Sequence, residues 1–145
     1  MKKTFLALFL VSFVFLTNAY AQNRGDGWPP ANILQEFGIP GMPLPTGASE
    51  ISWRRDWEQM EGPAWNMTGG KPAMRIGITG TNATGTAIKN WFESNGWKLL
   101  NNDFRANGFY IKGNSGAYYM YNDSEGQGQI VARILAEDFD EEYYQ

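Results

Sequence analysis

The side chains in this sequence that could take part in chemistry are carboxylates, amides, hydroxyls, amines and aromatic rings, because its 145 residues include no cysteine and no histidine. This excludes a thiolate nucleophile, a Ser-His-Asp or Cys-His relay, and a Cys/His metal site. Acid–base chemistry of the glycosidase kind needs two carboxyl groups facing each other across a cleft. The carboxylates available for it are Glu50, Asp56, Glu58, Glu61, Glu93, Asp103, Asp123 and Glu125. The sequence cannot place any two of these carboxylates opposite each other across a cleft. We therefore predict a non-enzymatic protein without cofactor or metal, and a small carboxylate-dependent hydrolase is the alternative.

Aromatic residues are unusually frequent, at 15% of the chain. Residues 117–121 alternate as a strand does, and large side chains point to both of its faces, with Tyr118 and Met120 on one and Tyr119 and Tyr121 on the other. Either the N-terminal segment of the chain covers the second face or a partner does. The candidate binding surface consists of Trp53, Arg54, Arg55, Trp57, Trp65, Tyr119 and Tyr121. Because Trp, Tyr and Arg concentrate at protein interfaces, we predict a protein-binding module; because rings also stack on sugars, a carbohydrate-binding module is the alternative.

Two motifs have part of the pattern of a ligand-binding loop. The stretch from Gly77 to Asn82 resembles the start of the nucleotide loop of Mur ligases, which implies phosphate binding. The Lys and Ser/Thr that hold phosphate and magnesium in such loops do not follow, so we predict a turn and a helix cap. Residues 122–126 carry oxygen ligands suited to calcium but lack the order of a calcium loop, and we predict a hairpin turn there.

One helix is predicted directly after the glycine-rich stretch. Its apolar residues Ala83, Ala87, Ile88, Trp91 and Phe92 recur with a period of 3.6 and fall on one stripe. Thr81 or Asn82 is expected to begin the helix, and Asn95-Gly96 to end it with a left-handed residue.

Period-two alternation predicts strands at residues 74–79, 98–101, 108–112, 117–121 and 129–135. Residues 49–67 are ambiguous, because Trp53 and Trp57 fit a strand and also sit at helical spacing; we favour the strand. The short turns between the last four strands require antiparallel pairing. The sequence therefore predicts an α+β fold: an antiparallel sheet of about four to six strands, a β-meander, with one main helix packed on one face. This order of elements resembles the periplasmic PepSY-like and β-lactamase-inhibitor-like proteins, which implies protein binding or inhibition.

A Pro/Gly-rich arm, residues 22–47, is predicted to precede the domain of residues 48–136. Within it, Pro30 to Phe37 can form a short helix followed by an extended arm, or the whole segment is a flexible tether. Residues 137–145 form an acidic C-terminal tail, with five acidic residues and no basic one.

The first 21 residues are predicted to be a secretory signal peptide. Lys2 and Lys3 precede an apolar run from residue 5 to 16, and Ala19-Tyr20-Ala21 provides the small residues before cleavage at Gln22. The run is shorter than the roughly 20 residues that span a bilayer, so we expect no stable membrane span. Without a cysteine the protein is not a lipoprotein, and we expect a periplasmic or extracellular location. The remaining 124 residues carry 10 basic and 15 acidic residues, which argues against nucleic acid as partner and leaves an envelope protein or glycan.

Overall fold

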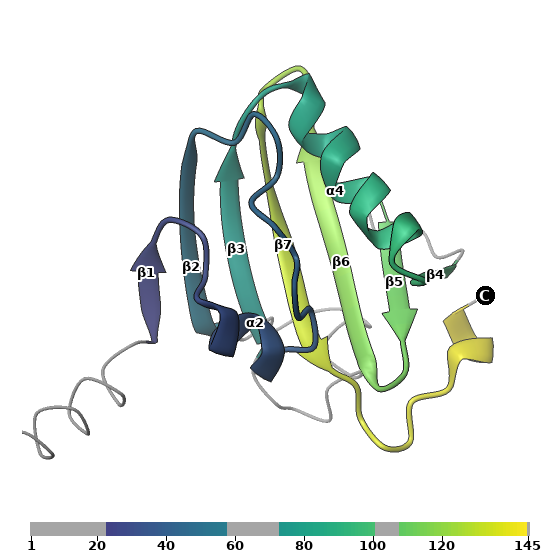
Figure 1. The fold of residues 1–145 in the computed structure, drawn as a ribbon. Coiled ribbons are helices and arrows are strands. Elements are labelled where there is room, and N and C mark those ends of the chain that lie inside the picture. The colour runs from purple at the N-terminus through teal and green to yellow at the C-terminus, as the bar shows by residue number, and fades with distance from the viewer. Residues whose placement is uncertain (1–22, 58–72, 101–107, 145) are drawn as a thin grey trace, which may run out of the picture.

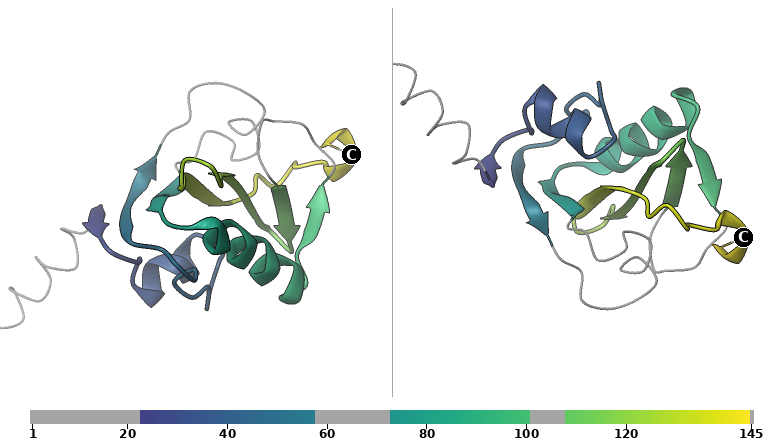
Figure 2. Two further views of the ribbon diagram at one scale, coloured as in Figure 1. Left: turned by 90° about the horizontal axis from the view of Figure 1, so that it is seen from above. Right: turned by 90° about the horizontal axis from the view of Figure 1, so that it is seen from below.

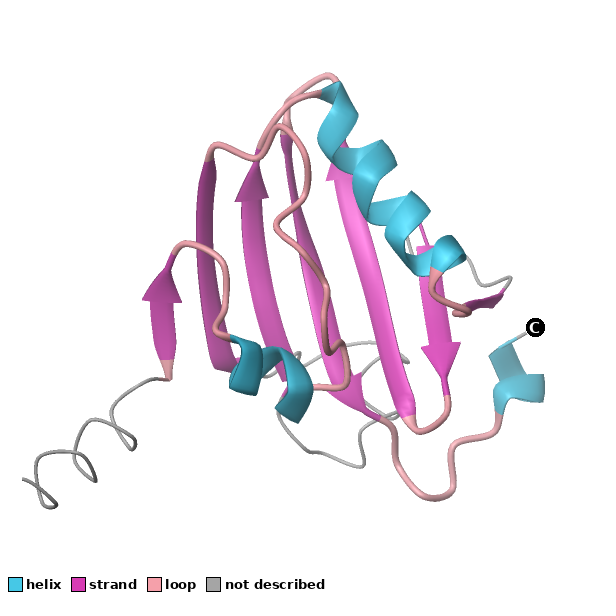
Figure 3. Ribbon diagram, viewed as in Figure 1, coloured by secondary structure: helices cyan, strands magenta, loops and turns pink. Residues whose placement is uncertain are grey.

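A seven-stranded antiparallel sheet forms the centre of the computed structural model, which describes residues 23–57, 73–100 and 108–144, with only the backbone at 56–57 and 143–144 (Figure 1). The strand order is β1-β2-β3-β7-β6-β5-β4. The strands are β1 (Arg24–Asp26), β2 (Glu50–Trp57), β3 (Ala73–Thr79), β4 (Lys98–Leu100), β5 (Gly108–Lys112), β6 (Ser115–Asn122) and β7 (Gln127–Ile134). The helices are α2 (Ala31–Glu36), α4 (Asn82–Ser94) and the 3₁₀ turn η1 (Glu141–Tyr144) (Figure 3).

The predicted α+β class and the antiparallel pairing are confirmed, but the sheet has seven strands instead of four to six. The seventh strand comes from β1, a segment of the Pro/Gly-rich region that pairs with β2. The strands also do not form one meander. They form two, β1-β2-β3 and β4-β5-β6-β7, which join where β7 pairs with β3. The sheet is continuous because α4 carries the chain from β3 to the far edge at β4, so that the second meander returns to β3.

Helix α4 begins and ends at the residues that its local sequence predicts. Thr81 is the N-cap, and its side-chain oxygen accepts a hydrogen bond from the Ala83 amide at 3.3 Å. The Thr84 hydroxyl accepts from the Thr81 amide and donates to the carbonyl of Thr46, which ties the helix start to the segment before β2. At the other end Asn95 is the C-cap and Gly96 has φ +79°. The glycine-rich stretch is therefore a turn and a helix cap, as predicted.

Both helices that follow β1 and β3 lie on the same side of the sheet. Figure 1 shows α4 in front of β5 and β6, and α2 with the segment after it in front of β2, β3 and β7; the two views of Figure 2 agree. The main core lies between these segments and the sheet. Its buried residues are Ile33, Leu34, Phe37, Ile39, Met42, Trp53, Met74, Ile76, Ile78, Ile88, Phe92, Trp97, Tyr110, Ala117, Tyr119, Tyr121, Ile130 and Ala132.

A second, smaller core lies on the opposite face of the sheet, around Tyr118. Its buried residues are Ala73, Leu100, Phe109, Ile111, Tyr118, Val131 and Leu135, with Phe139 packed against them. The N-terminal segment instead packs on the face with Tyr119 and Tyr121, because Ile39 and Met42 belong to the main core and Trp28 packs against it. Arg133 is buried on the second face, with its guanidinium carbon 5.3 Å from the centroid of the Tyr118 ring. Burial lowers the pKa of Arg133, and the nearby Tyr118 acts in the opposite direction.

Candidate functional site

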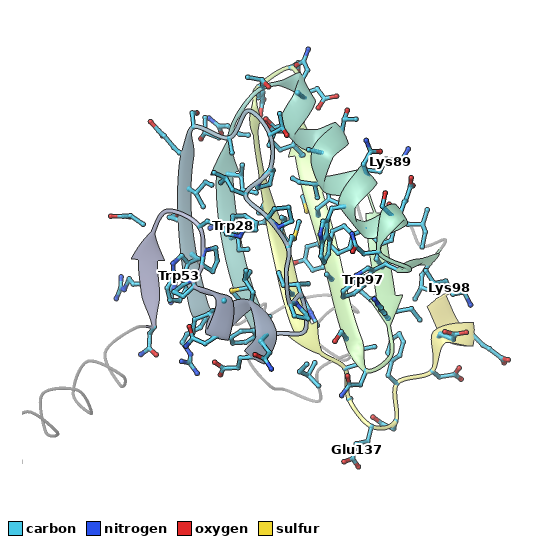
Figure 4. All side chains as sticks on the ribbon, viewed as in Figure 1. Trp28, Trp53, Lys89, Trp97, Lys98 and Glu137 are labelled. Atoms are coloured by element: carbon cyan, nitrogen blue, oxygen red, sulfur yellow. The ribbon has the colours of Figure 1, made fainter. Side chains whose placement is uncertain are left out.

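The aromatic residues of the candidate surface are core residues. Trp53 is 4% exposed, Tyr119 4% and Tyr121 6%. Trp53 lies against Gly25 of β1, where a Cβ atom would stand 2.7 Å from its ring nitrogen, and Figure 4 places it beside β1 and β2. The expectation that these three rings form an exposed surface is therefore corrected. The large number of rings is used to fill the core under α4 and the N-terminal segment.

A stack of three rings explains the burial of Tyr119. The ring centroid of Phe92 lies 4.7 Å from that of Tyr110 and 6.4 Å from that of Tyr119, with the planes within 13° of parallel. Burial in this stack, together with Tyr110, Glu93 and Asp123, raises the pKa of Tyr119 to about 12. Burial and the carboxylate of Glu93 also raise the pKa of Tyr110. Both phenols are therefore held in the neutral form, which suits a packed core.

Tyr121 is held by its hydroxyl as well as by its ring. The hydroxyl donates a 2.9 Å hydrogen bond to the carbonyl of Thr81 at the start of α4. Its ring packs against Gly85, where a Cβ atom would stand 2.9 Å from the ring. Tyr121 is thus a contact between the sheet and the first turns of the helix.

The two arginines of the candidate surface lie on opposite faces of β2, because neighbouring residues of a strand point to opposite sides. Arg55 makes an ion pair with Glu36 at the end of α2. Arg54 points to the other face, away from the main core. Trp65 and the side chain of Trp57 lie outside the described residues. The structure therefore does not bring the described members of the predicted surface together.

A different candidate surface lies on the face of the sheet opposite α2 and α4. Residues directly opposite one another in neighbouring strands share a face, so the register of β1, β2, β3, β7 and β6 defines this surface. Its exposed or half-buried residues are Arg24, Asp26, Glu50, Ser52, Arg54, Arg75, Gly77, Thr79, Met120, Asn122, Gln127 and Gln129. We call it the open face. None of these residues is aromatic. Their side chains are charged, amide and hydroxyl groups and one methionine.

The residues of the open face follow the register in rows across the strands. One row contains Arg24, Arg54 and Arg75, each directly opposite the next. We call it the arginine row. The next row runs through Asp26, Ser52, Gly77, Gln129 and Met120. Three cationic side chains therefore project side by side from three neighbouring strands.

Hydrogen bonds connect the arginine row to the next row. The Nε of Arg75 donates to Oε1 of Gln129 at 2.5 Å, and Nε2 of Gln129 donates to the sulfur of Met120 at 3.9 Å. Met120 is one of the few large apolar side chains that are exposed, at 36%. The amide of Gln129 thus fixes the positions of a cation and of an exposed apolar group on the same surface.

A shallow depression of about 1080 Å³ includes most of the open face. The residues of the open face that line it are Asp26, Glu50, Ser52, Arg75, Gly77, Thr79, Met120, Asn122, Gln127 and Gln129. Trp28, Leu44 and Ala48 line it from the N-terminal segment, so the depression reaches both sides of the sheet. It is broad and open, which fits a flat or convex partner better than an enclosed small molecule.

A second, smaller pocket of about 450 Å³ lies between the end of α4, the segment after α2 and the turn that joins β5 to β6. Trp91 and Trp97 line it, with ring centroids 6.2 Å apart and an interplanar angle of 46°. The Lys112 ammonium donates to the carbonyl of Asn95 at 2.7 Å at its rim. We call it the tryptophan pocket, and Figure 4 shows Trp97 near the end of α4. It brings aromatic, amide and cationic groups together.

The carboxylates considered for acid–base work are spread over the molecule. Glu50 lies at the start of β2, Glu93 faces Tyr110 and Tyr119, and Asp123 lies in the turn after β6. Glu125 follows in the same turn, where the side-chain oxygen of Asn122 accepts hydrogen bonds from the amides of Ser124 and Glu125. This is the predicted hairpin turn. The side chain of Asp56, and Glu58, Glu61 and Asp103, lie outside the described residues.

Within the described ranges, no group of three or more acidic side chains is placed to hold a metal ion. No helix in this part of the chain is long and apolar enough to cross a membrane. Comparisons of the chain with protein families, with curated proteins and with solved structures found no match.

Proposed function

We propose that this chain is a protein-binding module of the bacterial envelope and that its partner docks on the open face. The observation that carries the proposal is the composition of this surface, where Arg75, Gln129 and Met120 lie side by side on the neighbouring strands β3, β7 and β6. Arginine and methionine are enriched at protein interfaces relative to the rest of a protein surface, and amides supply the hydrogen bonds that set register. A broad sheet face of this kind offers area without a deep cleft, as protein interfaces do.

The opposite side of the sheet supports the choice of surface. Its apolar groups pack against α4 and against the segment around α2, and residues such as Phe92, Ile39 and Ile130 have no exposed area. A partner on that side would have to displace a packed core. The open face needs no such rearrangement, because its polar groups already face solvent.

The location in the envelope rests on the N-terminal sequence. Lys2 and Lys3, the apolar run and Ala19-Tyr20-Ala21 have the order of a secretory signal. A cysteine-free chain is compatible with an oxidising compartment, since its stability depends on cores and not on disulfides. The two cores on either side of the sheet supply that stability.

A matched pair of surface variants tests the proposal. Met120 on the open face and Leu99 on β4 are both exposed apolar residues, at 36% and 51%. Affinity capture from an envelope fraction with the tagged mature protein is expected to retain a defined protein. Met120→Glu should abolish its retention because the charge is buried against the partner, whereas Leu99→Glu should keep it. Retention that is lost with Leu99→Glu and kept with Met120→Glu would contradict the proposal.

The tryptophan pocket favours a second candidate function, carbohydrate binding. Trp91 is half-buried, so part of its ring borders the pocket, and Asn114 and Gln35 offer amides beside it. Aromatic rings with flanking amides suit the apolar face and the hydroxyls of a sugar. Titration with a panel of envelope glycans should then change the tryptophan fluorescence. Trp91→Ala should remove the change, and Lys89→Ala on the exposed side of α4 should not.

A further inference from the structure

We propose that two copies of this chain pair through the outer edge of β1, so that their two sheets join into one continuous sheet. The occupant of this edge is β1 of a second copy, which runs antiparallel to the first. The inference goes beyond the proposed function, because it concerns the edge of the sheet and does not depend on a partner that docks on the open face.

β1 is the outermost strand of the sheet, and it is bonded to β2 on its inner side. The carbonyl of Asn23 accepts a hydrogen bond from β2 at 2.8 Å, and the amide of Gly27 donates to β2 at 2.9 Å. Because main-chain groups of a strand alternate between its two sides, those of Arg24 and Asp26 point away from β2. Within the described ranges no strand pairs with this outer side. Such a row of main-chain donors and acceptors is a template for another strand.

The two edges of the sheet differ in what lies beside them. At the β4 edge, the ammonium of Lys98 makes an ion pair with Glu141 at 2.9 Å, which places the turn η1 next to the strand. Natural sheets protect an edge by covering it in this way. At the opposite end of the sheet in Figure 1, cleavage at the predicted site leaves only Gln22 and Asn23 before β1. We therefore place the pairing at β1.

The charges of β1 are complementary to those of the same strand reversed. When Gly25 lies opposite Gly25 of the second copy, Arg24 lies opposite Asp26 of that copy, and Asp26 lies opposite its Arg24. Both are hydrogen-bonded pairs, because their main-chain groups point outward, and each pair exchanges two N–H···O bonds. Arg24 and Asp26 are exposed and project from the same face of the strand. Each guanidinium therefore meets a carboxylate of the other copy, a pairing that two parallel hydrogen bonds strengthen.

Gly25 lets the two strands approach closely at the centre of the pairing. A Cβ atom at this position would stand 2.7 Å from the ring nitrogen of Trp53, so the packing of the main core requires the glycine. In the proposed register the two glycines form a non-hydrogen-bonded pair, in which the Cα atoms are about 4.5 Å apart. Gly27, with φ +82°, then turns the chain away toward α2, which confines the pairing to the three residues of β1.

The pairing has twofold symmetry, with the axis perpendicular to the sheet, because directly opposite residues of neighbouring strands share a face. The open faces of the two copies then lie on one side of the joined sheet, and the helices of both copies lie on the other. A three-residue strand buries less surface than the roughly 1,200 Å² of a stable complex. We therefore expect a weak dimer that forms at high protein concentration.

Charge exchange tests the pairing by sedimentation of the mature protein, residues 22–145, over a range of concentrations at low ionic strength. Arg24→Asp and Asp26→Arg each place like charges at both contacts, so each should weaken dimerisation about tenfold. The double variant Arg24→Asp/Asp26→Arg restores both opposite-charge pairs in reversed order and should recover the dimer. Lys89→Asp is the matched control, because it makes the same charge change at an exposed position of α4, and it should change nothing.

Introduced thiols test the register, because the chain has no cysteine of its own. Arg24→Cys and Asp26→Cys proteins, mixed under oxidising conditions, should form a disulfide with each other, since positions 24 and 26 lie directly opposite one another. The mixed pair also keeps one contact between Arg24 and Asp26 intact. Either variant alone should cross-link far less, because its two thiols lie diagonally, with Cα atoms roughly 7–8 Å apart, beyond the usual reach of a disulfide.

Several results would overturn the inference. A monomer at every concentration would mean that β1 does not pair with itself, and a dimer that Arg24→Asp leaves unchanged would use another surface. Failure of the double variant to recover the dimer, or equal weakening by Lys89→Asp, would show an effect of overall charge. Cross-linking of Arg24→Cys with itself as readily as with Asp26→Cys would show a different register. Circular dichroism and the thermal midpoint of each variant exclude unfolding as the cause.

This inference and the proposed function can fail independently. Met120 lies on β6, four strands away from β1 in the sheet order, so Met120→Glu should leave the dimer intact. If the dimer behaves as expected and Met120→Glu does not affect capture of an envelope protein, the pairing stands and the open face is not the binding surface. If capture depends on Met120 and the protein is always a monomer, the reverse holds.

Discussion

Arg24 and Arg54 lie directly opposite one another across the β1–β2 pair, on the face of the sheet opposite α2 and α4. Arg54 in turn lies opposite Arg75. The register therefore places three arginine side chains side by side on one face of the sheet.

Reversing the charge of Arg24 should make the protein more stable. Arg24→Glu replaces a like-charge pair by an opposite-charge pair across the strands, and we expect the free energy of unfolding to rise by about 0.2–1 kcal/mol. Urea unfolding at low ionic strength measures this, and Arg24→Gln should fall between the two. A lower stability of Arg24→Glu than of Arg24→Gln would show that the row is not under repulsion.

Gly85 in the first turn of α4 is expected to be required, although glycine disfavours helices. A Cβ atom on Gly85 would stand 2.9 Å from the ring of Tyr121 and 2.9 Å from a carboxylate oxygen of Asp123. Tyr121 cannot move easily, because its hydroxyl is bonded to the Thr81 carbonyl. Gly85→Ala should therefore lower the stability by about 1–3 kcal/mol through overpacking.

The neighbouring position provides the control for that variant. Thr86 is exposed on the same helix, and Thr86→Ala should leave stability unchanged or raise it by a few tenths of a kcal/mol through helix propensity. Thermal unfolding compares the two variants directly. If Gly85→Ala were as stable as Thr86→Ala, the contact between α4 and Tyr121 would be looser than the structure shows.

Alkaline pH should destabilise the protein through Tyr119. Its pKa is raised from 10.0 to about 12 in the folded state, so the folded state holds the proton more tightly than the unfolded chain. The resulting stabilisation is fully present below pH 10 and is lost as the pH rises through about 12. Urea midpoints measured from roughly pH 8 to pH 12 should fall steeply at the alkaline end.

Tyr119→Phe isolates this effect, because it keeps a ring in the stack with Phe92 and removes the ionisable group. The variant should lose less stability above pH 10 than the unmodified protein does. Tyr110, whose pKa is also raised, accounts for the pH dependence of stability that remains in this variant. An identical alkaline profile for both proteins would mean that Tyr119 ionises without hindrance.

The N-terminal sequence predicts the mature end of the chain. Expressed in a bacterium with an intact secretory pathway, the protein should be recovered from the envelope or the medium with Gln22 as its first residue. Intact-mass spectrometry of the fractionated protein measures this. A full-length chain in the cytoplasm would contradict the signal peptide and the proposed location.

Local signals in the sequence predict α4 and the hairpin turns well. Thr81 and Gly96 act on their own immediate neighbours, so the caps of the helix depend on few residues. The turn after β6 is likewise set by Asn122, whose side-chain oxygen accepts hydrogen bonds from the amides of Ser124 and Glu125. Such features do not require knowledge of the rest of the fold.

The arginine row could not be predicted in the same way. Arg75 and Gln129, which touch through their side chains, are 54 positions apart in the chain. They are neighbours because β3 pairs with β7. This pairing depends on α4, which carries the chain from β3 to β4 at the far edge of the sheet. The alternation of β2 is visible in the sequence, but the sequence does not show that Trp53 is covered by β1 and the segment around α2.

The most direct test of the open face as a binding surface is site-specific photo-cross-linking in living cells. A photoreactive phenylalanine derivative is placed at position 120 on the open face in one strain and at position 89 on the outer side of α4 in another. The account predicts a discrete cross-linked adduct with an envelope protein from position 120 and none from position 89. An adduct from position 89 alone would contradict it and would move the binding surface to the helical side of the molecule.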